Sequence, residues 1–174
     1  DEGVAEIRRQ MEKTGVGVNF VCADIFMESP FVRMDAATKN ENRRCLDHLI
    51  TQCANLGVEG IEIPCVDPSA IHNRAEEDEL LEALAPCLDR AGEAGIAIGL
   101  ETSLAPEPFA DLLNRCGHAA LRANYDTGNS SSLGYDPLEE MRAYGRLINN
   151  VHIKDRVLGG NTVPLGEGNA RIPE

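Results

Sequence analysis

Hydrophobic positions along this chain follow two alternating patterns. In one, apolar residues recur every three or four positions, as in an amphipathic helix; in the other, a short run is rich in β-branched residues, as in a buried strand. Each helical segment but the last ends on a glycine, and a strand-like run begins within a few residues of it. Glycine suits this place because it readily adopts the left-handed conformation that terminates many helices. The chain is therefore predicted to be a series of helix–glycine–strand units.

Five helices and five strands follow from this pattern. In the second helix, Cys45, Leu49 and Cys53 recur at intervals of four residues and share one helical face. The predicted helices cover residues 1–14, 42–56, 77–94, 106–116 and a segment that opens at residues 136–137. The predicted strands cover residues 16–22, 58–63, 96–100, 121–125 and 149–153. Such alternation predicts an α/β fold with parallel strands, either a doubly wound sheet or part of an eight-stranded barrel.

Charge and composition narrow the classes of partner. The net charge of −13 opposes binding to nucleic acid and leaves small molecules as the expected partners. No apolar run reaches the roughly 18 to 20 residues needed to cross a bilayer, and the charged N-terminal segment is unlike a signal peptide. We therefore expect no nucleic-acid or membrane partner and a cytoplasmic location. The six cysteines form no CxxC pair; we interpret them as buried free thiols, with a structural zinc site as the alternative.

Residues with metal-ligand chemistry stand at the carboxyl ends of the predicted strands, where parallel α/β folds place active sites. Glu101, Asp126 and His152 follow one another at separations of 25 and 26 residues, one βα unit each. Carboxylates and imidazoles are donors that suit Mn²⁺, Mg²⁺, Co²⁺ or Zn²⁺. These three residues are therefore predicted to form a divalent-metal site. Glu62, at the end of another predicted strand, is a weaker candidate with a supporting role.

Each of these residues alone has a structural alternative. Glu101 could mark the return of a strand to solvent, Asp126 could cap a turn, and His152 could be a hydrogen-bonded histidine of the core. Their recurrence at equivalent positions of three successive strands favours a shared site.

Four short motifs occur in a fixed order: GLET (99–102), NYDTGN (124–129), VHIKD (151–155) and VPLGEG (163–168). Together they resemble the xylose isomerase-like barrel family of sugar and sugar-phosphate isomerases and epimerases. The pairing of DTGN with HIKD and PLGEG is most similar to L-xylulose-5-phosphate 3-epimerase-like proteins. The resemblance covers nearly the whole chain.

The resemblance implies a (β/α)₈ TIM barrel that is incomplete in this chain. We expect a single partial domain over residues 1–174, with about five βα units and with the first and last strands absent, since complete barrels need about 250 residues. Glu101, Asp126 and His152 would bind the metal, and Glu101 would also act as acid and base. A fourth ligand, a glutamate on the eighth strand of the family, has no counterpart here. We therefore expect weak metal binding, little activity, and exposed strand edges that favour a homo-oligomer.

The implied reaction is 3-epimerisation of a ketose or ketose phosphate through an enediolate. Asn129 stands where free-ketose epimerases of the family carry histidine, which favours a phosphorylated or another acyclic substrate. Glu62, Lys154, Asp155 and Arg156 are further candidates for contact with substrate. Backbone N–H groups of the glycine-rich residues 159–160 and 166–168 could bind a phosphate, or this stretch could be a plain surface loop.

Other functions remain open. Within the enzymes, the alternatives are a hydroxypyruvate isomerase and an inosose dehydratase-like enzyme. An abasic-site endonuclease on the same barrel would need a basic track and more than the four histidines present. A non-catalytic α/β binding module would leave the three aligned ligands as a coincidence.

Overall fold

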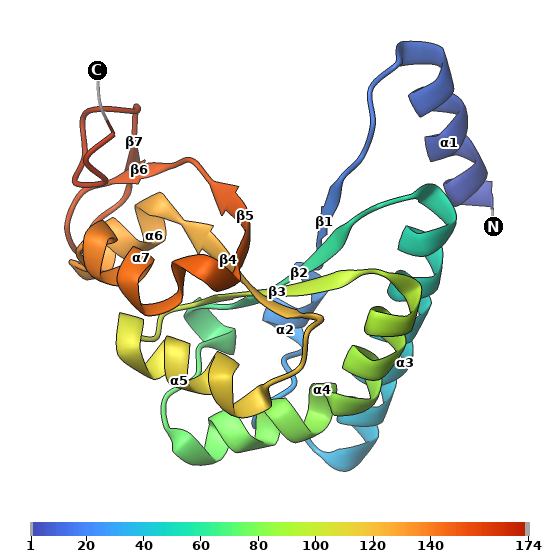
Figure 1. The fold of residues 1–174 in the computed structure, drawn as a ribbon, viewed down its shortest axis with the longest axis horizontal. Helices are drawn as coiled ribbons and strands as arrows, with labels where there is room; N and C mark the ends of the chain where they lie inside the picture. The colour runs from blue at the N-terminus through green and yellow to red at the C-terminus, as the bar shows by residue number, and fades with distance from the viewer. Residues whose placement is uncertain (1, 173–174) are drawn as a thin grey trace.

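A computed structural model describes residues 2–172, and its centre is a curled sheet of five parallel strands (Figure 1). The strands are β1 Phe20–Cys22, β2 Gly60–Cys65, β3 Ala97–Thr102, β4 Leu121–Asp126 and β5 Ile148–His152. They lie side by side in the order in which they occur along the chain. A doubly wound sheet would instead reverse its order at a switch point. The predicted parallel α/β fold is confirmed, and its architecture is a half-barrel.

Helices connect the successive strands and cover the outer face of the sheet (Figure 1). The main ones are α1 Glu2–Thr14, α3 Ala36–Leu56, α4 Arg74–Ala94, α5 Pro106–Cys116 and α7 Pro137–Tyr144. Gly57, Gly95 and Gly117 end α3, α4 and α5 in the left-handed conformation, with φ of 73°, 71° and 62°. The glycine stops expected from the sequence are therefore confirmed at these three helices.

Two helices begin earlier than their apolar periodicity predicted, because each has a polar cap. The side chain of Asp35 accepts a hydrogen bond from the backbone N–H of Thr38 at 2.8 Å, which starts α3 at Ala36. The side chain of Asn73 accepts a hydrogen bond from the backbone N–H of Glu76, which starts α4 at Arg74. Caps of this kind satisfy backbone donors that a helix start leaves free. Asp1, which the first predicted helix included, lies outside the described residues.

Several short elements have no counterpart in the sequence prediction. They are α2 Ile25–Glu28, η1 Asp67–Ser69, α6 Thr127–Leu133, η2 Gly145–Leu147, β6 Asp155–Arg156 and β7 Thr162–Val163. All are too short to show a hydrophobic period. Three of them lie just beyond the carboxyl ends of β4 and β5 along the chain, since α6 follows β4 directly and β6 and β7 form an antiparallel hairpin after β5.

The hydrophobic core lies between the sheet and the helices. Ile61 and Ile63 of β2 are buried in it, whereas Glu62 between them faces the other side of the sheet, because side chains alternate along a strand. The helices contribute fully buried leucine and isoleucine side chains, namely Leu46 and Ile50 of α3 and Leu80, Leu84 and Leu88 of α4. Apolar packing therefore holds the outer face and leaves the inner face for polar residues.

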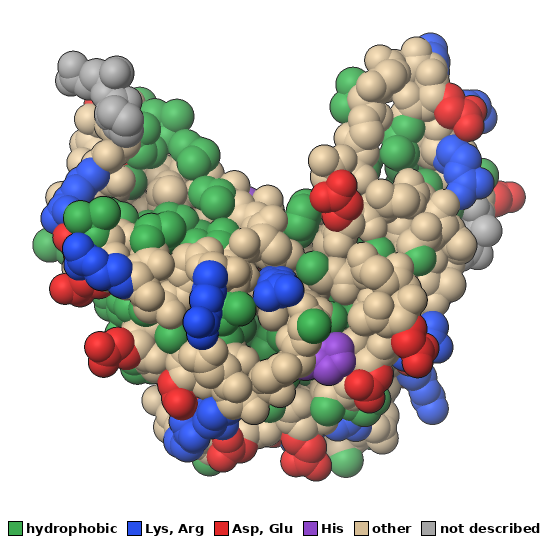
Figure 2. Space-filling view, viewed as in Figure 1, with side chains coloured by type: hydrophobic (Ala, Val, Ile, Leu, Met, Phe, Trp, Pro, Cys, Tyr) green, Lys and Arg blue, Asp and Glu red, His purple; other side chains and the backbone are tan. Residues whose placement is uncertain are grey.

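The two ends of the sheet stand apart. Figure 2 shows a hollow between the part that carries α1 and the C-terminal part with α6, β6 and β7. Val151 of β5 and Ile153 just after it are 45% and 61% exposed, so no helix of the described chain covers this outer surface. Within residues 2–172, no helix is both long and apolar enough to cross a membrane.

The cysteines are all free thiols, as expected. Cys53, Cys65 and Cys87 are buried, but Cys22, at the end of β1, is exposed. The interpretation of all six as buried was therefore wrong, since β1 lies at the edge of the sheet and has only β2 as a neighbour.

Candidate active site

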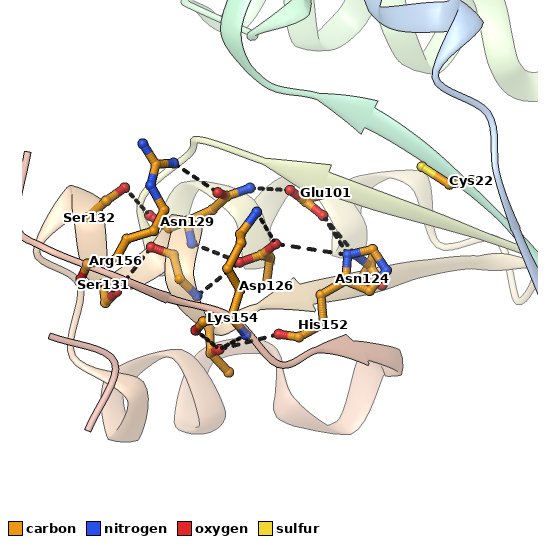
Figure 3. A network of polar contacts seen from close by, with 12 residues as sticks. Cys22, Glu101, Asn124, Asp126, Asn129, Ser131, Ser132, His152, Lys154 and Arg156 are labelled. Atoms are coloured by element: carbon orange, nitrogen blue, oxygen red, sulfur yellow. Dashed lines mark hydrogen bonds and ion pairs between the residues drawn. The ribbon is translucent and has the colours of Figure 1, made fainter. Parts of the chain in front are cut away.

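Polar side chains gather at the carboxyl ends of β3, β4 and β5 (Figure 3), and Glu62 lies in the middle of β2, where its register partner is Gly99. Glu62, Glu101, Asp126 and His152 each come from a different strand. Parallel pairing places these ends at one edge of the sheet; Asp126, for example, is the register partner of His152. The structure therefore brings together the three residues predicted as metal ligands and adds Glu62 to them.

His152 contacts two of the carboxylates. Its Nε2 atom lies 3.2 Å from Oε2 of Glu62, and its Nδ1 atom lies 3.3 Å from Oε2 of Glu101. The imidazole is 39% exposed, whereas the side chains of Glu62 and Glu101 are only 4% and 8% exposed. The site is thus open to solvent on the histidine side and closed behind the two glutamates.

Asp126 is held by both of its oxygens. Oδ1 accepts hydrogen bonds from the backbone N–H groups of Gly128 and Asn129, at 2.9 and 2.8 Å, and so caps α6. Oδ2 lies 2.8 Å from Nζ of Lys154 and 3.9 Å from Nδ1 of His152. Asp126 therefore has the turn-capping role weighed from the sequence, and one oxygen of it also faces the cluster.

Amide side chains hold Glu101 in place. Nδ2 of Asn124 donates to Oε2 of Glu101 at 2.9 Å, and Nδ2 of Asn129 donates to Oε1. Nδ2 of Asn150 donates in turn to Oδ1 of Asn124 at 2.7 Å. Sequence reasoning missed Asn124 and Asn150, although each lies two positions before a predicted ligand, and the two-residue period of a strand places them on the same face.

Burial and the neighbouring Glu101 carboxylate raise the pKa of Glu62 from its ordinary value to about 8. Two buried carboxylates so close together resist carrying two negative charges at once. The surroundings of Glu62 and Glu101 therefore favour a proton or a cation.

Lys154 lies across the start of α6. The side-chain oxygen of Thr127 accepts from the backbone N–H of Lys154 at 3.0 Å and donates to its carbonyl at 2.6 Å, which ties the end of β5 to β4. A Cβ atom on Gly128 would meet Cγ of Lys154 at 2.8 Å. The glycine after Thr127 is therefore required for the close approach of Lys154 to Asp126.

Asp155 lies outside this cluster, although it was predicted to contact substrate. Its buried carboxylate accepts backbone hydrogen bonds from Gly166, Gly168 and Ala170, all at 2.9 Å. These bonds, with that from Ala170 the most important, lower the pKa of Asp155. The N–H groups of Gly166 and Gly168 that were considered for phosphate binding thus already have an acceptor, because Asp155 organises its own loop.

The cluster has the composition of a divalent-cation site. One oxygen of Glu62, one oxygen of Glu101 and a ring nitrogen of His152 lie within 4.8 Å of one another. Direct ligands lie roughly 2.0 to 2.2 Å from a cation such as zinc, so small side-chain movements would allow all three to share one. Together with Asp126, the two glutamates give three buried carboxylates, which face the ammonium group of Lys154 and the imidazole of His152. The residues present therefore fit a cation bound by oxygen and nitrogen.

Comparison with known proteins agrees with this arrangement of strands. The xylose isomerase domain protein from Planctomyces limnophilus superimposes with a TM-score of 0.82 at 19% identity, over 98% of this chain and 67% of that one. A D-tagatose 3-epimerase-like protein superimposes with a TM-score of 0.79 at 20% identity, over 97% and 67% of the two chains. A xylose isomerase-like TIM barrel protein from Mycobacterium smegmatis in complex with magnesium gives 0.71 at 17% identity, over 97% and 64%. At these identities the likeness establishes a shared fold.

This chain spans about two thirds of the length of those structures. No curated protein sequence matches it significantly. A family model, however, matches residues 1–174 in full, and its description is xylose isomerase-like TIM barrel. The half-barrel, the parallel strand order and this match agree: the chain belongs to the xylose isomerase-like TIM barrel family.

Proposed function

We propose that the protein is a divalent-metal-dependent isomerase or epimerase of a ketose or ketose phosphate, which transfers a proton next to the substrate carbonyl. The observation that carries this proposal is the buried Glu101 carboxylate near the end of β3, in contact with His152 at the end of β5, with β4 between the two strands. The fold shared with a D-tagatose 3-epimerase-like protein supports the same class of reaction. Among the substrates, the sequence motifs favour a pentulose 5-phosphate such as L-xylulose 5-phosphate.

Glu101, Asp126 and His152 would hold the cation, which would be Mn²⁺, Mg²⁺, Co²⁺ or Zn²⁺. Glu62 is close enough to His152 to provide a further oxygen. For Asp126 to bind, its Oδ2 atom must exchange the ammonium group of Lys154 for the cation. Once bound, the cation would polarise the substrate carbonyl as a Lewis acid and stabilise the developing negative charge.

Glu101 is the proposed base that removes or returns the C3 proton on one face of the ketose; inversion at C3 requires a second proton donor on the opposite face. Its two amide partners, Asn124 and Asn129, orient the carboxylate without neutralising it. Lys154, Asn129 and Arg156 are the proposed contacts to the hydroxyl groups and the terminal group of the sugar. The partly exposed side of His152 would be the face from which substrate enters.

Exchange of the C3 proton with solvent tests the function directly. The protein is incubated in D₂O with Mn²⁺ and a panel of ketoses and ketose phosphates, and deuterium at C3 is followed by NMR. We expect deuterium to enter at least one substrate, and EDTA to abolish the exchange. Exchange needs only one base, so it does not depend on a second carboxylate for inversion. Absence of exchange with every substrate in the presence of metal would contradict the proposal.

Titration with Mn²⁺ by calorimetry tests the ligands separately from activity. We expect His152→Ala to weaken Mn²⁺ binding by at least about 10-fold, because the loss even of a group that supports a ligand typically costs 10- to 100-fold. Glu62→Gln and Asp126→Asn show which carboxylate completes the site in this chain. Glu59→Gln is the matched control, since Glu59 is exposed at the other end of the same strand region. Unchanged Mn²⁺ affinity in His152→Ala would show that this cluster is not the metal site.

A further inference from the structure

A small pocket lies beside the candidate active site, at the same edge of the sheet. Its volume is about 120 Å³, which is room for about four water molecules at roughly 30 Å³ each. Ser103 after β3, Ser132 of α6 and Arg156 of β6 line it, and Asn129 separates it from Glu101. The proposed function makes Asn129 and Arg156 contacts to the substrate, but it does not specify the chemistry of the group that this pocket would hold.

Arg156 brings an unneutralised positive charge to the pocket. Its Nε and one terminal nitrogen donate to the carbonyl of Gly160, at 3.1 and 2.8 Å, and the other terminal nitrogen donates to Oδ1 of Asn129 at 2.9 Å. All these acceptors are neutral, and no carboxylate of residues 2–172 forms an ion pair with Arg156. A guanidinium has five N–H donors. Two donors, one on each terminal nitrogen, therefore have no acceptor in the described chain.

The pocket offers one further donor and one charge of opposite sign. The hydroxyl of Ser103 has no hydrogen-bond partner among the described residues, whereas that of Ser132 already donates to the carbonyl of Asn129 at 2.9 Å. Asp67 also borders the pocket and is exposed. Its carboxylate forms no ion pair with Arg156 in the described structure, so the charge of the guanidinium stays available.

A chain of hydrogen bonds sets the distance between this pocket and the reacting end of a substrate. Arg156 donates to the amide oxygen of Asn129, and the amide nitrogen of the same residue donates to Glu101. Figure 3 shows the three side chains in this order. One asparagine side chain thus separates the guanidinium from the proposed base, which suits a short substrate that reaches both.

We propose that this pocket is a subsite for an anionic terminal group, a phosphate or a carboxylate, on the substrate whose carbonyl end lies at Glu101. The two free N–H donors of Arg156 would bind two oxygens of the anion in the bidentate geometry that guanidinium groups favour, and Ser103 would donate a third hydrogen bond. The charge of arginine persists at every working pH. This assignment rests on the proposed function for the identity of the substrate, but not for binding of the anion itself.

Binding of simple anions tests the subsite without metal or turnover. Inorganic phosphate and acetate are titrated into the protein in EDTA, and binding is followed by calorimetry and by shifts of backbone amide NMR signals around residues 103 and 156. We expect saturable binding of one of the two probes and at least a 10-fold loss in Arg156→Gln, since hydrogen bonds to charged groups are the stronger ones. Phosphate binding assigns the subsite to a sugar phosphate, and acetate binding assigns it to a sugar acid. Arg142→Gln is the matched control on the exposed surface of α7.

Two further variants keep the result interpretable if Arg156→Gln unfolds. Arg156→Lys retains the charge but not the paired donors and should weaken binding less than Arg156→Gln. Asp67→Asn removes the nearby negative charge and should strengthen binding of the anion. No saturable binding of either probe, or equal binding in wild type and Arg156→Gln, would overturn the subsite. Neither result depends on whether the protein exchanges a C3 proton, so the subsite and the proposed function can fail separately.

Discussion

In the variant Glu101→Gln, we expect exchange of the substrate's C3 proton with D₂O to fall by a factor of about 100 or more. General acid–base catalysis typically contributes roughly 10²- to 10⁴-fold, and glutamine retains an oxygen donor but no basic carboxylate. Exchange rates measured by NMR at saturating Mn²⁺ separate the loss of the base from weaker metal binding. Exchange that persists at the wild-type rate would show that another residue is the base, with Glu62 as the next candidate.

The surroundings of Glu101 call for a control on stability. Asn124 and Asn129 donate to different oxygens of its carboxylate, so the NH₂ group of a glutamine would face one amide donor in either orientation. Leaving a buried donor without an acceptor costs about 1 to 3 kcal/mol. Thermal unfolding of Glu101→Gln should therefore be measured beside that of Glu59→Gln, which makes the same chemical change at an exposed position. A loss of exchange in a protein that remains folded at the assay temperature identifies the missing base as the cause.

The second large effect is expected on stability, in the variant Glu140→Ala. Glu140 of α7 is 2% exposed, and its oxygens accept hydrogen bonds from Tyr125 at 3.0 Å, Tyr144 at 2.7 Å and Ser130 at 2.6 Å. Burial, together with Glu140 itself, raises the pKa of both tyrosines, so their hydroxyl groups remain donors. Removal of the carboxylate leaves three donors without their acceptor. We expect a loss of about 3 kcal/mol in the free energy of unfolding.

For a chain of this length, such a loss lowers the melting temperature by about 6 to 12 °C, which circular dichroism measures readily. Glu139→Ala is the matched control, because Glu139 is the exposed neighbour on the same helix. Tyr144→Phe removes a single hydroxyl and should cost about 1 kcal/mol. Equal melting temperatures for Glu140→Ala and Glu139→Ala would contradict a stabilising role. Since Ser130 belongs to α6, the network also holds the helix that carries Asn129 beside Glu101.

The succession of strands and helices was predictable from the sequence because it depends on local patterns. Apolar spacing identifies each amphipathic segment, and glycines such as Gly57 and Gly95 adopt a left-handed conformation that other residues rarely accept. Parallel pairing then places the carboxyl ends of all strands at one edge. Recurrence of polar residues at those ends was therefore enough to predict that Glu101, Asp126 and His152 lie close together.

Which of those side chains contact one another was decided by the tertiary structure. Curling of the sheet brings Glu62 of β2 within 3.2 Å of His152 of β5, although β3 and β4 lie between these two strands in the sheet. Asp155 carries the same charge as Asp126, yet it turns to three backbone N–H groups of its own loop. Side-chain alternation determines the face on which a residue lies. Its contacts depend on the curvature of the sheet and on the course of loops such as residues 157–170, which have no hydrophobic period that reveals their path.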